Sequence, residues 1–440
     1  MLAVSLLLTW NVHTTAQSIT DAINYGTFNV GGTARTIGIG GAISALGGDF
    51  AVLSTNPAGL AVYRKSEVVF SPGLNLSQTT GQLLTGNNPA FDENKTYFNF
   101  NNLGLVFSSK GNNWKTSNFG IGFNRLADFR EELNYEGNSP GSIVNWFVEI
   151  ATDGNGVSIA PQNLNPYGAG LAFQAEAFFD GTSDPNDDDY FWTTDFDLAP
   201  DAEITRSEQI SRKGSINEVV LSWAGNYRNR LMIGVTLGVP FLRDTKERIY
   251  REEDPVAGPE GNVPFFNNLT YTESLETSGT GINLKLGMIY RVSQLLRLGA
   301  AVHTPTRFAL TDEFNNSLAY TFTLDGDIIG NFAEPGAPRN FEYNVVTPWR
   351  FLGSAAAIIR KHGFVSAEIE WVNYAGTNFN LTRNSQNIAA DQAFEDVLNA
   401  DIENLYQSAL NIRFGGEYAY QKFRARAGFA MTGNSLADGD

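Results

Sequence analysis

Segments in which apolar and polar residues alternate recur along this chain and restrict the folds open to it. In one of them Ile282, Leu284 and Leu286 alternate with Asn283 and Lys285. Successive side chains of a β-strand point to opposite faces, so each segment predicts a strand with one apolar and one polar face. Charges keep to one face, which favours a membrane barrel with a polar lumen over a soluble β-sandwich. The clearest segments are 232–239, 282–291, 296–303, 364–371 and 410–420.

The connections between the predicted strands alternate between long and short. Short turns are expected near Gly111, Asn229, Ser293, His362 and Gln421, and the longest connection is an insert over 131–215. Outer-membrane barrels have short periplasmic turns and long extracellular loops, so this order favours a transmembrane antiparallel β-barrel. Eleven strands are predicted, over 66–76, 96–109, 116–130, 216–228, 231–248, 271–291, 295–313, 341–360, 363–379, 408–420 and 422–432.

An odd number of strands is unexpected in a bacterial barrel, because an even number lets the first and last strands close antiparallel. One interpretation is that the barrel, assigned to 63–440, is incomplete at its C-terminus and lacks about three strands. The alternative is that strands were merged or split, for which 271–291 and 341–360 are long enough.

Composition excludes several kinds of function. The chain has no cysteine and three scattered histidines, so we expect no metal site, no cofactor and no catalytic residue. A net charge of −17 argues against nucleic acid as a partner and suits a bacterial surface bearing lipopolysaccharide. Residues 1–16 are typical of the apolar part of a secretory signal peptide without its basic start, and no other stretch is long enough for a membrane helix.

The segment before the first predicted strand does not have a strand pattern. Residues 38–49 are mostly glycine, alanine and other small residues, which allow tight packing in a confined space. Asn56 then offers a helix N-cap, Pro57 suits the first helical position and Gly59 is expected to end the turn. A phosphate-binding loop is excluded because no Gly-Lys-Ser/Thr ending is present.

This glycine- and alanine-rich run, followed by Asn-Pro-Ala-Gly-Leu at 56–60 directly before a barrel, resembles the hatch of the FadL/TodX family of outer-membrane transporters. Later segments are also similar to that family: 298–305, 347–351, 370–374 and 412–418. The resemblance implies a barrel of fourteen strands, of which eleven are predicted here, and a hatch over 17–62 inside the lumen. Asn56, Pro57, Ala58 and Gly59 are then the expected hatch and gating residues.

The resemblance also implies a function and a location. The family takes up long-chain fatty acids and other hydrophobic compounds passively across the bacterial cell outer membrane. The expected partners are a hydrophobic ligand, outer-membrane lipid, lipopolysaccharide and the barrel assembly machinery. A lateral gap at a kink in the third strand would fall in 120–128, where Gly120 and Gly122 permit a bend.

The long insert contains aromatic residues with two possible roles. Trp146, Phe147, Phe178 and Phe179 are candidates for an extracellular surface that first captures an apolar ligand. The alternative is that they pack the insert against itself. The acidic residues of 184–189 resemble the start of a calcium loop, but the glycine and the bidentate glutamate of such a loop are missing.

Charged residues predicted to face the lumen form a ladder on neighbouring strands. Opposite charges side by side would brace the wall and hold the hatch. Alternatively, one of the arginines binds the carboxylate of a ligand. The ladder consists of Glu368, Glu370, Arg413, Glu417, Arg424 and Arg426.

Two functions remain open. The first is passive uptake of hydrophobic small molecules through a hatch-gated barrel, without catalysis. The second is an accessory outer-membrane barrel of a protein secretion system. An apolar pocket in the lumen would favour the first, and a lumen filled with side chains would favour the second.

Overall fold

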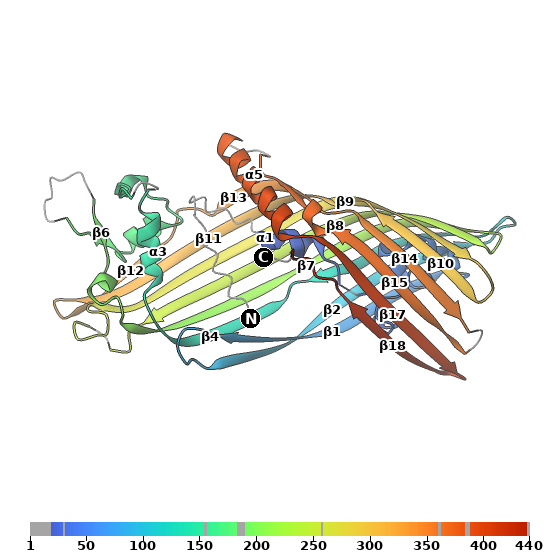
Figure 1. Cartoon of the computed structure of the whole chain (residues 1–440), viewed down its shortest axis with the longest axis horizontal. Helices are drawn as coiled ribbons and strands as arrows, with labels where there is room; N and C mark the ends of the chain where they lie inside the picture. Colours follow the sequence, from blue (N-terminus) through green and yellow to red (C-terminus); the bar gives the residue numbers. More distant parts are fainter. Residues whose placement is uncertain are drawn as a thin grey trace.

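A computed structural model shows one strongly curved antiparallel sheet with helices at one end and along one side (Figure 1). It describes residues 19–29, 31–153, 156–182, 190–256, 258–359, 362–382 and 388–437. The sheet has sixteen strands, eleven of which follow one another as the wall, in the order β1-β2-β3-β7-β8-β9-β10-β14-β15-β17-β18. β1 and β18 are the two edges of this path.

The bounds of the wall strands are β1 (Glu67–Gln82), β2 (Ala90–Ser109), β3 (Trp114–Asp128), β7 (Glu203–Tyr227), β8 (Leu231–Glu253), β9 (Phe266–Arg291), β10 (Leu296–His303), β14 (Arg350–Ile358), β15 (Gly363–Asn373), β17 (Ser408–Tyr420) and β18 (Phe423–Met431). The other strands are β4 (Glu131–Pro140), β5 (Phe179–Asp180), β6 (Trp192–Thr193), β11 (Arg307–Leu324), β12 (Asp327–Ala333), β13 (Arg339–Val346) and β16 (Asn378–Asn380). The helices are α1 (Ile19–Gly26), α2 (Ala34–Gly38), α3 (Ile143–Ile150), α4 (Ala169–Gln174) and α5 (Ile388–Leu405), with 3-10 turns η1 (Phe50–Ser54), η2 (Pro57–Val62), η3 (Pro161–Asn163), η4 (Asp195–Leu198) and η5 (Tyr374–Gly376).

The two faces of the wall differ as the alternation predicts. Ile282, Leu284 and Leu286 of β9 are exposed on the outer face, whereas Asn283 and Lys285 between them are buried on the inner face. The same pattern in neighbouring strands makes a continuous apolar outer band, which a soluble protein would not expose. The fold is therefore all-β, a transmembrane antiparallel β-barrel wall with its polar face inward.

The eleven predicted strands correspond to the eleven wall strands, but three of them were merged with a neighbour. Segment 363–379 runs from β15 through η5 into β16, and the other two are interrupted by proline. Segment 295–313 is divided into β10 and β11 at Pro305, and 341–360 is divided into β13 and β14 at Pro348. Proline has no backbone N–H, so it interrupts the ladder at both positions. The two interruptions are joined by a hydrogen bond from the Thr306 backbone N–H to Thr347 Oγ1, at 2.9 Å.

The predicted insert 131–215 was too long. Its last part, 203–215, belongs to β7, and β4 at its start pairs with that part of β7. These residues are polar on both faces, so alternation did not reveal them as strand. The insert proper lies over 131–202, and Figure 1 places its α3 and β6 beside β12 at the long-loop end, opposite the short-turn end near β10 and β14.

Residues 19–62, the N-terminal segment, contain helices and turns but no strand among those described. Part of this segment packs on the inner face of the wall: Phe50, Leu53 and Leu60 share a buried cluster with Val220 and Ile289 of β7 and β9. A second cluster joins α1 and α5 to β11 and β13, and a third joins the insert to β8, β9 and β11. None of the helices in the described ranges is long and apolar enough to cross a membrane.

Candidate functional site

Asn56 connects the N-terminal segment to the wall. Its Oδ1 accepts a hydrogen bond from the Ala58 backbone N–H at 3.2 Å, which caps η2. Its Nδ2 donates to the backbone oxygens of Ser44, at 3.1 Å, and Met288, at 3.3 Å. The side chain is fully buried. Asn56 therefore holds the turn, the glycine-rich coil and β9 together, with Pro57 at the first position of the turn.

Glycine 59 has a different role from the predicted one. The 3-10 turn continues to Val62, so Gly59 does not end it. A Cβ at this position would lie 2.9 Å from Val52 Cβ and 3.0 Å from Gly47 Cα, so glycine is needed for close packing. Across the interface, a Cβ on Gly234 or Gly287 of the wall would clash with Pro57 or Asn56.

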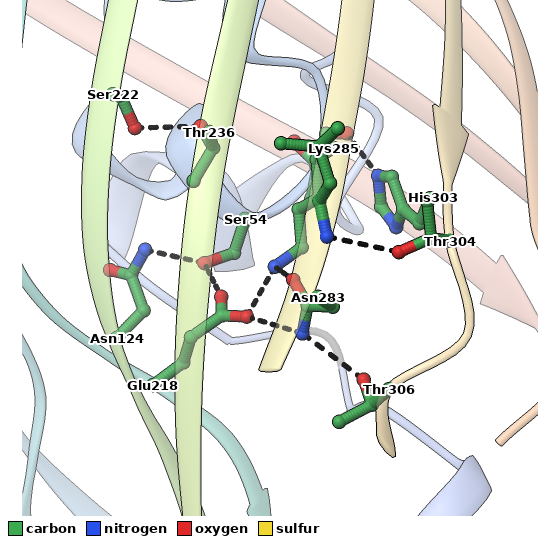
Figure 2. Close-up of polar contacts among 12 residues, drawn as sticks. Ser54, Asn124, Glu218, Ser222, Thr236, Asn283, Lys285, His303, Thr304 and Thr306 are labelled. Carbon is green, nitrogen blue, oxygen red and sulfur yellow. Dashed lines mark hydrogen bonds and ion pairs between the residues drawn. The ribbon is translucent and has the colours of Figure 1, made fainter. Parts of the chain in front are cut away.

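A buried polar network lies beneath this contact (Figure 2). Glu218 of β7 and Lys285 of β9 form an ion pair with almost no exposed surface. Glu218 also accepts hydrogen bonds from Ser54 Oγ at 2.7 Å and from Asn283 Nδ2 at 3.0 Å. Asn124 Nδ2 of β3 donates to Ser54 Oγ at 2.8 Å. Three strands thus hold the end of η1.

His303 of β10 and Arg350 of β14 add further contacts between the wall and the N-terminal segment. His303 Nε2 donates to the Thr55 carbonyl oxygen at 2.6 Å, and Arg350 donates to the Gly26 carbonyl oxygen. Neither residue is among those predicted from the sequence to have a role. Their partners lie 248 and 324 positions away, so no local pattern reveals these contacts.

The predicted charge ladder separates into two groups. Arg413 pairs with Glu368 at 2.7 Å and with Glu370 at 2.5 Å, and Arg350 pairs with Glu370 at 2.6 Å. Glu368 also accepts from the Ser44 backbone N–H at 3.1 Å, which joins this group to the N-terminal segment.

The second group lies nearer the short-turn end. Arg426 contacts Glu417 at 2.8 Å, while Arg424 approaches it only to 3.8 Å. The strands therefore do not bring all six residues into one ladder.

A pocket lies between the N-terminal segment and the wall, with a cavity volume of about 70 Å³. We call it the central pocket. Its lining combines apolar residues such as Phe28, Leu126 and Leu352 with polar residues such as Thr55 and His303. Its charged lining residues are all paired: Glu370 and Arg413 with each other, and Arg125 with Asp128 at 3.0 Å.

The four aromatic residues of the insert do not form one exposed surface. Phe147 and Phe178 are completely buried in the insert cluster, and Trp146 packs against it. Phe147 makes an edge-to-face contact with Tyr271 of β9, with ring centroids 5.5 Å apart. Only Phe179 is largely exposed. The expectation of a shared capture surface is therefore wrong for Phe147 and Phe178, because the insert buries them against the inner face of the wall.

In β3 the irregularity falls within the predicted range 120–128, but it comes after Gly120 and Gly122, the glycines expected to permit a bend. Gly122 and Gly120 are packed against Phe50 and Leu53, so they make room for the N-terminal segment. The irregularity is a bulge between Arg125 and Ala127. Pairing of β3 with β2 ends at Asn124, and 90–100 of β2 pairs with β1 and not with β3.

Some sequence expectations lie outside the described residues, namely the signal peptide 1–16 and the acidic run 184–189. Within the described ranges, no group of three histidine, aspartate or glutamate residues is placed to hold a metal ion.

Comparison with known proteins gives similarity at the level of structure alone. No protein-family model matches the chain, and no curated protein matches it. The toluene transporter TodX of Pseudomonas putida matches over 93% of this chain and 86% of its own, with 13% identity and a TM-score of 0.46. The monoaromatic hydrocarbon channel CymD matches over the same shares, with 13% identity and a TM-score of 0.44. A FadL homologue of Pseudomonas aeruginosa matches over 92% and 91%, with 11% identity and a TM-score of 0.38.

Proposed function

We propose that this protein takes up hydrophobic small molecules passively across a bacterial outer membrane, with the N-terminal segment as its hatch. The observation that carries the proposal is the central pocket, which lies between that segment and the wall. An apolar outer face suits the membrane, and a pocket with apolar walls and a few polar groups suits a small apolar ligand. The long-loop end then faces the cell surface with its lipopolysaccharide, and the barrel assembly machinery inserts the protein.

The contacts of the N-terminal segment suit a gate. Asn56, Ser44, Ser54 and Thr55 are attached to the wall by hydrogen bonds, several of them between backbone and side chain. Such bonds are individually weak, so groups in the lumen can replace them when the segment moves. In this proposal Asn56, Pro57, Ala58 and Gly59 form the rigid part of the gate, since they are the residues most closely packed against the wall.

The pairing of charges bears on which ligand the central pocket accepts. Arg413 is held by two carboxylates and Arg125 by Asp128, so neither offers a free charge to an incoming carboxylate. An uncharged apolar molecule loses least on entering such a pocket, because burial of an unpaired charge is costly. The central pocket is therefore suited to the apolar part of a ligand.

Two steps of the route are further proposals. Phe179, exposed on the insert, is the remaining candidate for first contact with an apolar ligand. The end of pairing between β2 and β3 at Asn124 offers a lateral exit into the outer-membrane lipid.

Uptake in living cells tests the proposal. Cells lacking their own fatty-acid transporter would express the complete gene and be given labelled long-chain fatty acid and labelled toluene. We expect uptake of at least one ligand, lost in Asn56→Ala and retained in Asn163→Ala, which removes an exposed amide from η3. A folded, surface-exposed barrel that takes up neither ligand would contradict the proposal and favour the secretion-accessory function.

A further inference from the structure

Four arginines near the short-turn end lack ionic partners. Within the described residues, Arg35, Arg64, Arg291 and Arg297 form no ion pair, although each has a guanidinium that is always charged. Arg413, deeper in the lumen, is instead bound by two carboxylates. The turn end of the lumen therefore holds positive charge that no carboxylate of the described residues neutralises through an ion pair.

These guanidinium groups lie close enough to affect one another. Arg291, Arg35 and Arg64 all act on the charge of Arg297, and all three repel it. Arg297 donates one hydrogen bond, to the Leu46 carbonyl oxygen at 2.7 Å, and Arg35 donates to the Gly48 carbonyl oxygen at 3.0 Å. Arg291 Nε is buried without a hydrogen-bond partner. A guanidinium has five N–H donors, so most of this hydrogen-bonding capacity is unused.

Three of the arginines, Arg35, Arg64 and Arg297, line a pocket that we call the turn-end pocket, with a cavity volume of about 560 Å³. Arg424 also lines it, and two carboxylates, Glu67 and Glu417, are present. Glu417 is already bound by Arg426 at 2.8 Å, so positive charge remains in excess. The same pocket has an apolar part, formed by Leu46, Val62, Ile358, Phe364 and Ala419.

The excess of positive charge is confined to the turn-end pocket. The whole chain carries a net charge of −17, so a positive pocket is not a consequence of overall composition. Arginine binds carboxylate and phosphate groups through two parallel hydrogen bonds, which makes such a group the natural partner of these side chains. Leu46 and Phe364 beside them would contact an apolar chain.

We propose that the turn-end pocket binds the anionic head group, carboxylate or phosphate, of an amphiphile whose apolar chain lies against Leu46 and Phe364. The carboxylate would belong to a ligand leaving the lumen, and the phosphate to a lipid of the adjacent leaflet. For the first source the inference depends on the proposed uptake function, because that function brings the ligand to the pocket.

Binding to the purified full chain in lipid nanodiscs tests this site without requiring transport. The ligands are dodecanoate and dodecanol, which share an apolar chain and differ in charge. The variant is Arg64→Gln with Arg291→Gln: Arg64 lines the pocket, and Arg291, which does not, acts on the charge of Arg297. Neither residue has a hydrogen bond to the N-terminal segment among the contacts described. The control is Lys110→Gln, which removes a charge from the same end of the barrel but not from the pocket.

We expect dodecanoate to bind more tightly than dodecanol, and the double variant to weaken dodecanoate binding about tenfold or more, as loss of charge-assisted hydrogen bonds does. Dodecanol binding and the control should not change. Equal affinity for the two ligands, or an unchanged dodecanoate affinity in the double variant, would overturn the proposal.

The source of the head group is decided by two further ligands, a lysophosphatidate with the same chain and inorganic phosphate. Binding of dodecanoate alone supports a departing ligand, and binding of the lysophosphatidate supports a membrane lipid. Tight binding of inorganic phosphate without either amphiphile would contradict the role given to the apolar residues. Toluene uptake is measured separately in cells, so its absence counts against the proposed function while the binding results still decide the site.

Discussion

Arginines line both the central pocket and the turn-end pocket, but they differ in pairing. Those of the central pocket form ion pairs, whereas Arg35, Arg64 and Arg297 of the turn-end pocket form none within the described residues. At the central pocket Arg413 lies between Glu368 and Glu370, and a second arginine, Arg350, shares Glu370. At the turn-end pocket Arg297 forms no ion pair in the described part of the chain, is repelled by three other arginines and donates to a backbone oxygen. The paired charges join strands to one another and to the N-terminal segment, whereas the unpaired charges are available to a ligand.

The difference follows from the cost of burial. A charge removed from water must be compensated by a partner, and a buried pair that loses one member leaves the other uncompensated. Glu368 and Glu370 are buried, so their arginines are required for folding. Arg64 is exposed at the mouth, so water compensates it until an anion arrives.

The largest effect is expected on removing a paired arginine. Arg413→Ala leaves two buried carboxylates with reduced compensation and should lower the free energy of unfolding by about 3–5 kcal/mol. The measurement is urea unfolding in lipid vesicles. Arg243→Ala, which breaks an ion pair whose arginine is 73% exposed, is the control and should change stability far less. Equal effects of the two substitutions would show that burial of the ion pair does not decide its contribution to stability.

The next effect concerns the packing beside the paired charges. In Gly287→Ala the new Cβ would clash with Asn56, which should displace the N-terminal segment at a cost of about 1–3 kcal/mol. We expect faster proteolysis within 31–62 and greater entry of a hydrophilic antibiotic. Gly330→Ala is the control, because its nearest contact, Thr321 Oγ1, is 3.7 Å away. Unchanged proteolysis in Gly287→Ala would show that the segment is not held at Asn56.

A smaller effect is expected when a further carboxylate is added to the turn-end pocket. Ala419→Glu places an acid beside Arg297 and Arg424, so that this pocket resembles the central one. Dodecanoate affinity should fall about tenfold, close to 1.4 kcal/mol, while barrel stability changes little. Ala419→Gln has nearly the same shape without the charge and should retain most of the affinity. If Glu and Gln have the same effect, the pocket responds to volume and not to charge.

The smallest effect is expected at Arg424. Its side chain is 43% exposed and 3.8 Å from Glu417, which Arg426 already binds at 2.8 Å. Arg424→Ala should therefore change the free energy of unfolding by less than about 0.5 kcal/mol in the same urea experiment. A loss as large as that for Arg413→Ala would place Arg424 among the bracing charges after all.

The features of this molecule that depend on residues close together in the chain could be predicted from the sequence. Alternation correctly assigned Glu368 and Glu370 to the inner face, because the two faces of a strand follow from its period alone. The Asn-Pro pair at 56–57 correctly indicated a capped turn, since cap and first position are neighbours in the chain. Residues 203–215 were missed because a strand beyond the lipid has no need of an apolar face.

Contacts between residues far apart in the chain could not be predicted from the sequence. Lys285 was recognised as facing inward, but its partner Glu218 is 67 positions away, and pairing depends on how β7, β8 and β9 are aligned. Arg291 and Arg297 flank a predicted short turn, and Arg35 and Arg64 lie in or just after the predicted hatch, yet nothing local distinguishes Arg297 from Arg413.

The sequence by itself determined the eleven wall strands in outline, their two faces and the capped turn at Asn56, because each depends on residues within a few positions of one another. Only the tertiary structure decided which charges meet. Strand register and the position of the N-terminal segment place Arg413 between two carboxylates and Arg297 among arginines. Electrostatic energy depends on distance in space, and in a barrel that distance is set by strands far apart along the chain.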